Sequence, residues 1–476
     1  MNEPRSVDAD PRVAAPWKRL GHLGLAIDNA SWLAAGHLLR WGAALFGGIL
    51  VARYLGPEQF GAYRFVIALV TICIPFWTLG LTSILSKELI LHPDRQDTIL
   101  GTALLLRLLA GLLGSALLVL GVMAFGGTDR PLALYVGIVS IGGCLSALEA
   151  LRPWFEIRAA ARRVVPVQVI MTYFAAGAKG LLVLAQAPFF VFMVVASADL
   201  ALAGVATAIA FVRQQQKVRS FRFRSTVARH LLRRSWPLLL AGLASAIYLK
   251  IDQLMLAWMV SYSASGIYAV AATLSEMWYI LATVAAAAIY PFLIRSKRNN
   301  EKSYRVRLQQ GYDMLFMAAL ALAVATTLIA RPLIDILYGA PYVAAAPILM
   351  IHIWGALFMF TRELFSKWLI IESLYLYSLW THAAGAILNV LLNLILIPYA
   401  HEIGAAVATV ISYAVAGLVS ALIFPRTRPA GWMMARATTA PLRLALGPRA
   451  YLSALRWGVT DPGTLDPPTR RCDGSP

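Results

Sequence analysis

Long apolar runs separated by short polar connections dominate the hydropathy pattern of this chain. A hydrocarbon core of roughly 30 Å needs about 20 consecutive apolar residues in a helix. Runs of that length predict twelve transmembrane helices, and therefore an all-α polytopic membrane protein. Their approximate ranges are 33–54, 61–84, 99–125, 131–151, 166–186, 189–212, 235–260, 266–294, 309–330, 342–366, 374–398 and 403–424.

Positive charges divide unequally between the two alternating sets of connections. If the N-terminus is cytoplasmic, the inner connections and the two termini hold most of the 42 lysines and arginines. The outer connections hold only Arg53, Arg64, Arg130 and Arg331. Because cytoplasmic loops are enriched in these residues, both termini are predicted to be cytoplasmic. The same enrichment accounts for the net charge of +19 without nucleic-acid binding.

The longest internal connection divides the predicted helices into two groups of six. Gly61 and Tyr63 follow a turn in the first group, as Gly266 and Tyr268 do in the second. With six helices each, both groups enter the membrane from the same face, so the repeat is parallel, and such transporters bind substrate between their halves. The predicted domains are a polar cytoplasmic segment (1–32), an N-lobe (33–212), a basic cytoplasmic linker (213–234), a C-lobe (235–424) and a basic cytoplasmic tail (425–476).

Charged residues within the apolar runs are the candidate functional residues. A charge at the bilayer centre costs about 2.5–3.5 kcal/mol on insertion scales unless it is paired or hydrated. Lys250 and Asp252 share one run, and residues two apart point about 200° apart on a helix. We expect Lys250 to line a central cavity and Asp252 to contact a neighbouring helix. Glu276 lies at a similar depth on the next helix, either lining one pocket with Lys250 or forming a structural ion pair with it.

Three further cations, Arg40, Arg107 and Lys179, lie within runs of the first half. Cations that face a water-filled cavity attract an anionic substrate. Arg40 and Arg107 have the alternative of extending to the inner membrane face, whereas Lys179 lies near the middle of its run. The predicted substrate-binding residues are Lys250, Lys179, Arg40 and Arg107, and the residues predicted to organise these charges or to carry a coupling proton are Asp252 and Glu276.

The chain lacks the residues that several classes of protein function require. The chain has no GxxxxGK[ST] phosphate loop, so it is not an ATPase. The longest outer connection, 331–341, carries one carboxylate, and no nucleophile is paired with a base. Cys73, Cys144 and Cys472 show neither disulfide nor metal-ligand spacing. We therefore expect no enzymatic activity, no cofactor and no metal site.

Five segments carry a resemblance to a known family. They are LVARYLGPEQFGAY (50–63), SWPLLLAGLASAIYLKIDQLML (235–256), SGIYAVAATLSEMWYI (265–280), RPLIDILYGAPYVAAAPIL (331–349) and GAILNVLLNLILIPYAHEIGAAVATVISYAVAG (385–417). These segments resemble the Wzx-type polysaccharide-biosynthesis flippases of the multidrug/oligosaccharidyl-lipid/polysaccharide exporter superfamily.

The resemblance implies a V-shaped, alternating-access transporter in the bacterial inner membrane. Its implied substrate is a polyprenyl-pyrophosphate-linked oligosaccharide, moved from the cytoplasmic to the outer leaflet for surface or exopolysaccharide assembly. The implied driving force is a proton or sodium gradient. Lys250 and Asp252 lie in the YLKIDQ motif of the resemblance, and Glu276 lies in its LSE motif.

Two other functions stay open on the sequence alone. One is a cation-coupled exporter of small amphipathic molecules, which predicts altered drug tolerance and normal surface glycan after deletion. The other is a non-transporting subunit that binds other polysaccharide-assembly proteins through its basic loops and tail. In that case neutralising Lys179 or Lys250 leaves glycan export intact. The expected partners are the lipid-linked oligosaccharide, membrane lipids, and H⁺ or Na⁺.

Overall fold

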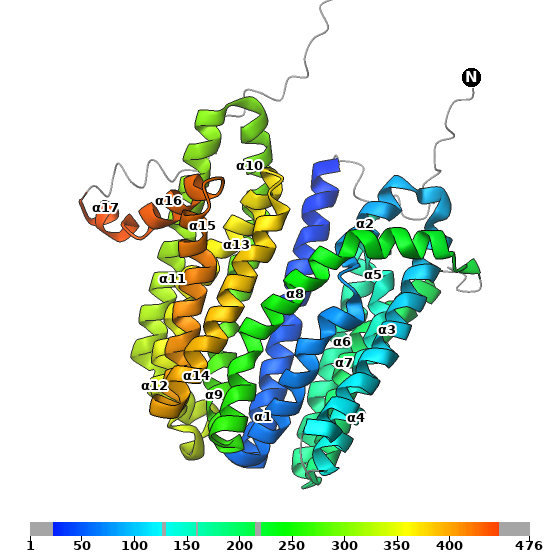
Figure 1. The fold of residues 1–476 in the computed structure, drawn as a ribbon, viewed down its shortest axis with the longest axis vertical. Coiled ribbons are helices and arrows are strands. Elements are labelled where there is room, and N and C mark those ends of the chain that lie inside the picture. Colours follow the sequence, from blue (N-terminus) through cyan, green and yellow to red (C-terminus); the bar gives the residue numbers. More distant parts are fainter. Residues whose placement is uncertain (1–21, 126–129, 159, 215–219, 447–476) are drawn as a thin grey trace, which may run out of the picture.

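The computed structural model describes residues 22–125, 130–158, 160–214 and 220–446. Within these residues the chain forms helices and turns, with no β-strand (Figure 1). Helices are expected because backbone amides in lipid must be hydrogen-bonded within their own segment. The helices before the central connection are α1 (His22–Thr78), α2 (Thr82–Leu91), α3 (Gln96–Phe125), α4 (Arg130–Leu145), α5 (Arg152–Ile157), α6 (Ala161–Leu184) and α7 (Phe189–Arg213).

The second part of the chain repeats this helical pattern. Its helices are α8 (Ser225–Met259), α9 (Tyr262–Glu276), α10 (Tyr279–Asn299), α11 (Glu301–Tyr338), α12 (Ala345–His352), α13 (Ala356–Ile371), α14 (Tyr375–Ala414), α15 (Ser420–Ile423), α16 (Arg428–Ala437) and α17 (Ala440–Leu446). A short 3-10 segment joins α4 to α5 at Ser146–Leu151, and another joins α12 to α13 at Ile353–Gly355. Both breaks fall in the fourth crossing of their half.

Ten segments of the described chain are long and apolar enough to cross a membrane. Two of them are of double length, Ser31–Leu91 and Leu376–Ile423, and each bends back on itself at a residue with positive φ. These residues are Gly56 (φ 71°) and His401 (φ 46°). A left-handed backbone breaks the helix, and glycine adopts it without steric cost. Counted as two crossings each, the double segments bring the candidate crossings of the described chain to twelve, the number that the hydropathy pattern predicted.

Helix ends extend beyond the apolar runs. α1 begins at His22, inside the predicted polar segment, and α8 begins at Ser225, inside the predicted linker. In both places helical backbone continues into polar sequence because hydropathy marks the membrane boundary and not the helix end. The short helices α16 and α17 lie in the predicted tail and are not among the membrane-crossing segments. The division into an N-lobe and a C-lobe stays a prediction.

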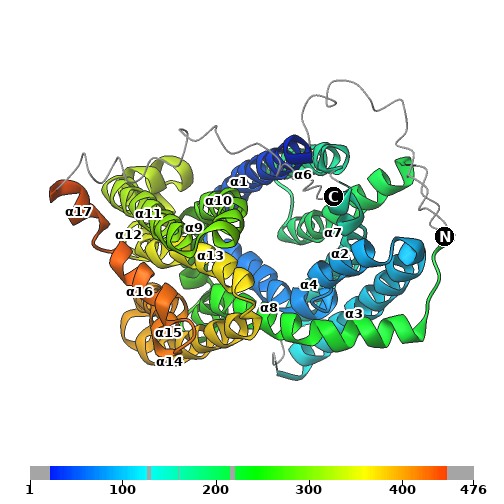
Figure 2. The same ribbon diagram turned by 90° about the horizontal axis from the view of Figure 1, so that it is seen from above.

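The helices form two groups that converge at one end of the molecule and separate toward the other (Figure 1). One group contains α1–α7 and the other contains α9–α15. The bends within α1 and α14 lie at the convergent end, which we call the Gly56 end. α2 and α16 lie toward the opposite end, which we call the α16 end. In the view from above, the two groups lie on opposite sides and α8 runs along one side between them (Figure 2).

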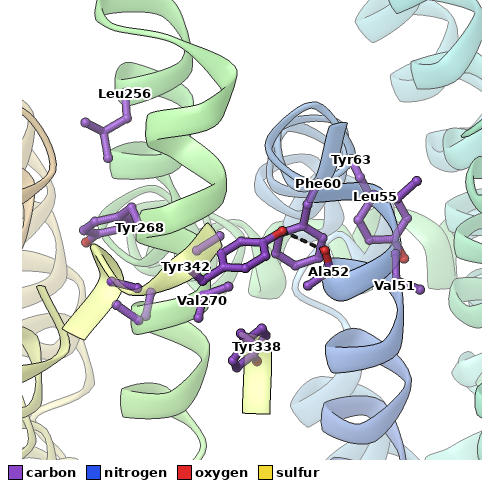
Figure 3. Close-up of a cluster of buried hydrophobic side chains, with 14 of the residues drawn as sticks. Val51, Ala52, Leu55, Phe60, Tyr63, Leu256, Tyr268, Val270, Tyr338 and Tyr342 are labelled. Carbon is purple, nitrogen blue, oxygen red and sulfur yellow. Dashed lines mark hydrogen bonds between the residues drawn. The ribbon is translucent and has the colours of Figure 1, made fainter. Parts of the chain in front are cut away.

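Buried aromatic side chains join the two groups at the Gly56 end (Figure 3). The rings of Phe60 and Tyr342 pack edge to face with centroids 6.2 Å apart. The Tyr342 hydroxyl donates a hydrogen bond of 2.8 Å to the carbonyl oxygen of Ala52. The backbones of α1 and α9 also touch, since a Cβ on Gly266 would lie 2.1 Å from the Pro57 carbonyl oxygen. The Gly56 end is therefore closed in this conformation.

Helix α8 contacts both groups along its length. Near its N-terminal half, a Cβ on Gly80 would lie 2.5 Å from the backbone nitrogen of Leu239, so the turn before α2 packs directly on α8. Farther along, Asp252 accepts a hydrogen bond from Asn393 of α14. The helix that carries Lys250 and Asp252 is thus packed against one group at its start and the other at its end.

Candidate substrate cavity and ion site

Two adjoining cavities, one within the first helix group and one between the two groups, carry most of the predicted cations. The first, about 310 Å³, is lined mainly by α1, α6 and α7, including Arg40. The second, about 290 Å³, is lined by both groups, including Lys250 and Glu276. Lys179 and Asp199 line both cavities and connect them. Polar side chains from both helix groups therefore face a shared space within the membrane-crossing region.

Lys250 and Glu276 form an ion pair at the wall of the second cavity. The Lys250 Nζ atom lies 2.7 Å from Glu276 Oε2, as expected from their similar depths on antiparallel helices. Their side chains keep 18% and 13% of their full exposure, so both are accessible from the cavity while being largely desolvated. A charge-assisted hydrogen bond of this kind offsets the cost of placing each charge in the membrane.

Lys179 also has a carboxylate partner, which the sequence analysis did not identify. It forms an ion pair with Asp199 of α7, and its own side chain is only 10% exposed. Gly47 of α1 makes room for it, because a Cβ there would lie 3.2 Å from Lys179 Cδ. Asp199 lies near the middle of α7 (Phe189–Arg213). Lys179 is therefore a paired cation at the junction of the two cavities.

Arg40 lines the first cavity, and its guanidinium donates two hydrogen bonds to neighbouring residues. It donates to the side-chain oxygen of Gln168 at 3.1 Å and to the carbonyl oxygen of Gly36 at 3.3 Å. Arg107, in contrast, lies among neither set of cavity-lining residues. It is 1% exposed and donates to Thr82 Oγ1 at 2.7 Å. The expectation that Arg107 faces the cavity is not met, because its side chain turns into the packing of α3 against α2.

Arg64 is a cavity cation that the sequence analysis assigned to an outer connection. It lines the second cavity, together with Lys179 and Lys250. Its Nε atom is buried and has no hydrogen-bond partner in the described part of the chain. Arg64 lies close to the start of a predicted apolar run, and for this reason it was counted outside the membrane. The described structure instead places the Arg64 side chain in the lining of the second cavity.

Asp252 points away from the cavity into a buried polar cluster, as its spacing from Lys250 predicted. It is 2% exposed. Its carboxylate accepts hydrogen bonds from Tyr268 Oη at 2.8 Å, from Thr409 Oγ1 at 2.6 Å and from Asn393. Asn393 also lies 3.3 Å from Asn389 Oδ1. No ion pair to Asp252 is found among the described residues, so its negative charge is compensated only by neutral donors.

Two of the residues in the Asp252 cluster could have been noticed in the sequence as polar residues within an apolar run, although a hydropathy average does not reveal them. Asn389 and Asn393 lie four residues apart in one apolar run, which places both on the same face of a helix. The resulting cluster offers carboxylate, hydroxyl and amide oxygens, the ligand type of hard cations. Within the described residues, no group of three or more His, Cys, Asp or Glu is placed to hold a metal ion.

Solved structures of transporters share this fold. A structure described as the lipid II flippase MurJ in an inward closed conformation superposes with a TM-score of 0.66, at 15% identity over 90% of this chain and 98% of that one. An inward-facing multidrug resistance MATE family transporter of the MOP superfamily gives 0.63, at 14% identity over 84% and 95%. A MOP superfamily transporter from Pyrococcus furiosus gives 0.53, at 15% identity over 88% and 96%.

These similarities define a multi-pass helical membrane protein with the fold of MOP superfamily transporters. Residues 26–297, more than half of the chain, match the family described as "Polysaccharide biosynthesis protein", and the chain belongs to that family. No curated protein sequence matches the chain. Family and fold together indicate a membrane flippase or exporter and not an enzyme.

Proposed function

We propose that this protein is a flippase that moves a polyprenyl-pyrophosphate-linked oligosaccharide from the cytoplasmic to the outer leaflet of the bacterial inner membrane. The observation that carries the proposal is the second cavity, where Arg64, Lys179 and Lys250 line one space between the helix groups. Cations inside a membrane are costly, and they mark binding paths for charged substrates. A pyrophosphate is the anionic part of the substrate class that a polysaccharide biosynthesis family suggests.

The cavity is arranged to exchange its internal ion pairs for contacts with phosphate. Arg64 has a buried donor without a partner, and a guanidinium binds phosphate through two parallel hydrogen bonds. Lys179 and Lys250 are each held by one carboxylate, Asp199 and Glu276. An entering pyrophosphate competes with these carboxylates for the ammonium groups. Arg40 extends the same positive surface into the first cavity.

The closed Gly56 end supports alternating access between two leaflets. With both termini in the cytoplasm, the α16 end faces the cytoplasm and the Gly56 end faces outward. The present conformation is then inward-facing, because the contact between Tyr342 and Ala52 closes the outer side. Opening that contact while the α16 end closes would expose the substrate to the outer leaflet.

Asp252 is the proposed site of the coupling cation. A buried carboxylate without a positive partner favours binding of a proton or of a small cation. Na⁺ would find oxygen ligands from Asp252, Thr409 and the two asparagines, whereas H⁺ would neutralise the carboxylate directly. Because Asp252 and the cavity residue Lys250 lie on the same helix, occupation of this cluster is positioned to influence the cavity.

The test is transport of a labelled lipid-linked oligosaccharide by the purified protein in liposomes, with and without a sodium or proton gradient. We expect transfer between leaflets, and we expect Arg64→Gln to reduce it strongly. Arg331→Gln, which removes an exposed arginine outside both cavities, is the matched control and should transport normally. If the labelled lipid stays on its original leaflet under every gradient, the proposal is wrong. Export of small amphipathic molecules in its place would favour the drug-exporter alternative.

A further inference from the structure

A third cavity lies at the α16 end, apart from the two central ones and on the flank of the second helix group. It measures about 550 Å³ and is enclosed by α11 together with the two short tail helices, α16 and α17. Figure 1 shows α16 and α17 running outward from the side of the helix group and not along it. Its polar and aromatic lining includes Arg305, Gln309, Asp313, Trp432, Arg436 and Arg443.

The walls of this cavity are fixed by buried polar contacts. Arg443 of α17 donates to both carboxylate oxygens of Asp313 at 3.0 and 2.8 Å. Gln309 donates to the same carboxylate at 2.8 Å and to the carbonyl oxygen of Met433 at 3.0 Å. The Asp313 side chain is only 5% exposed, so these contacts are largely shielded from solvent. The tail helices are therefore docked on α11 by specific hydrogen bonds.

The charge that this docking leaves in the cavity is positive. Asp313 is neutralised by Arg443, which leaves Arg305 and Arg436 as the cationic side chains of the lining. Arg305 pairs with Glu301 at 3.0 Å, but both side chains are more than half exposed. An exposed pair of this kind contributes little free energy, so a stronger anion can replace Glu301. The cavity can accept one negatively charged group between two helices.

The two tail helices that line this cavity also expose large apolar side chains, of which Trp432 belongs to the lining. Trp432 is 65% exposed, and Leu442 and Leu446 on α17 are 61% and 79% exposed. Ala430 and Met434, on the opposite side of α16, are buried against the helix group. A short helix with basic and apolar exposed side chains is typical of a segment lying in the membrane interface. Tryptophan is enriched at that depth.

We propose that this cavity binds the headgroup of an anionic phospholipid from the leaflet at the α16 end. Arg305 and Arg436 would contact the headgroup phosphate, while Trp432 and Leu442 would contact the acyl chains. Basic pockets between transmembrane helices at the interface are suited to such headgroups. This site shares no residue with the two central cavities, so it does not depend on the proposed transport function.

The experiment is a titration of the full-length protein in detergent micelles with phosphatidylglycerol, with retained lipid counted by native mass spectrometry. We expect at least one tightly retained phosphatidylglycerol. Arg305→Gln and Arg436→Gln should each weaken its binding roughly five-fold, which corresponds to the attraction of one basic residue for an anionic membrane. Arg426→Gln is the matched control, because this exposed arginine precedes α16 and does not line the cavity.

Three outcomes would overturn the proposal. Equal retention of phosphatidylcholine would mean that the cavity recognises acyl chains without the charge. Equal weakening by Arg426→Gln would indicate a general basic surface and not a site. Displacement of the lipid by millimolar inorganic phosphate alone would show that the cavity selects free phosphate. A thermal melt of each variant separates loss of lipid from loss of fold, and Trp432→Ala tests the apolar wall independently of charge.

Discussion

The ammonium group of Lys250 lies 2.7 Å from the carboxylate of Glu276, which ties α8 to α9 at the wall of the central cavity. Two residues farther along α8, Asp252 is turned into a separate buried cluster of neutral donors. One helix therefore presents a paired charge to the cavity and an unpaired charge to the protein interior. The roles of Lys250 and Asp252 can therefore be tested by separate experiments.

Removing the cation of the Lys250–Glu276 pair should weaken substrate binding. Lys250→Gln deletes a charge-assisted contact of about 1.5–3 kcal/mol, so affinity for the lipid-linked substrate should fall roughly 10- to 150-fold. Glu276→Gln removes the competitor for the same ammonium group and should leave affinity equal or higher. Binding of a fluorescent lipid pyrophosphate to the purified variants measures both effects.

The double variant Lys250→Glu with Glu276→Lys separates substrate binding from a structural role. It preserves an ion pair but moves the positive charge from α8 to α9. If Lys250 contacts the substrate, transport should stay low although the protein melts at the wild-type temperature. Full recovery of transport would instead mean that the pair only stabilises the fold.

Asp252→Asn should uncouple transport from the ion gradient. The amide has nearly the same shape but lacks the negative charge that we propose holds H⁺ or Na⁺. Coupling free energies of about 1–3 kcal/mol correspond to roughly 5- to 150-fold stimulation, and this stimulation should fall to about one-fold in the variant. Liposome transport with imposed sodium and proton gradients measures the ratio and identifies the ion.

The melting temperature of Asp252→Asn distinguishes a coupling residue from a packing residue. Replacing a buried, unpaired carboxylate by a neutral amide removes a desolvation cost, so stability should be equal or higher. A strongly lowered melting temperature with intact gradient stimulation would contradict the coupling role. Thr409→Val, which removes one oxygen from the same cluster, should weaken the response to the gradient in the same direction.

The number of crossings could be predicted from the apolar runs and the distribution of charged residues. Both are read directly from the residue types, without knowledge of how the helices pack. The bilayer requires apolar helices of fixed length, so twelve runs become twelve crossings. The ends of helices were less predictable. α1 and α8 start within polar sequence at His22 and Ser225, where helical backbone continues beyond the lipid.

The candidate site was predictable where depth along a helix determines which residues meet. Lys250 and Glu276 lie on the two antiparallel helices that flank one turn, 10 and 15 residues from it, so their depths are similar although not equal. Depth along a helix does not tell which way a side chain points around the helix axis. That direction determines the environment of Arg107, whose side chain is buried in packing against Thr82. Asp199, the partner of Lys179, lies on the next helix but 20 residues away, and two partners of Asp252, Asn393 and Thr409, come from α14, far away in the sequence, so identifying them required the packing itself.

The close contact of α1 with α9 should control opening of the Gly56 end. A Cβ on Gly266 would lie 2.1 Å from a backbone oxygen of Pro57, which cannot move as a flexible side chain would. Gly266→Ala should therefore destabilise the closed state by about 1–3 kcal/mol, the usual cost of overpacking. Cysteines placed at Ala52 and Tyr342 and joined by a bifunctional thiol reagent should crosslink less in this variant than in the parent.

Gly42→Ala is the control for the gate, because a Cβ there meets nothing within 4 Å. It should leave crosslinking at the Gly56 end unchanged. If Gly266→Ala crosslinks as readily as the parent while folding normally, the two backbones do not act as the gate. If both glycine variants reduce crosslinking equally, the effect comes from adding a methyl group to either helix and not from the contact.

Arg443→Ala should undock the tail helices from α11. It removes both charged hydrogen bonds to Asp313 and leaves a buried carboxylate held by Gln309 alone. Breaking a buried ion pair from one side costs about 3–5 kcal/mol, and the partial exposure of Arg443 places this site at the lower end. The melting temperature should drop clearly, and adding Asp313→Asn should recover most of the loss because no unpaired charge remains.

Arg426→Ala, an exposed control near α16, should melt like the parent. Equal melting of the parent and Arg443→Ala would mean that the tail helices contribute no stability through this contact.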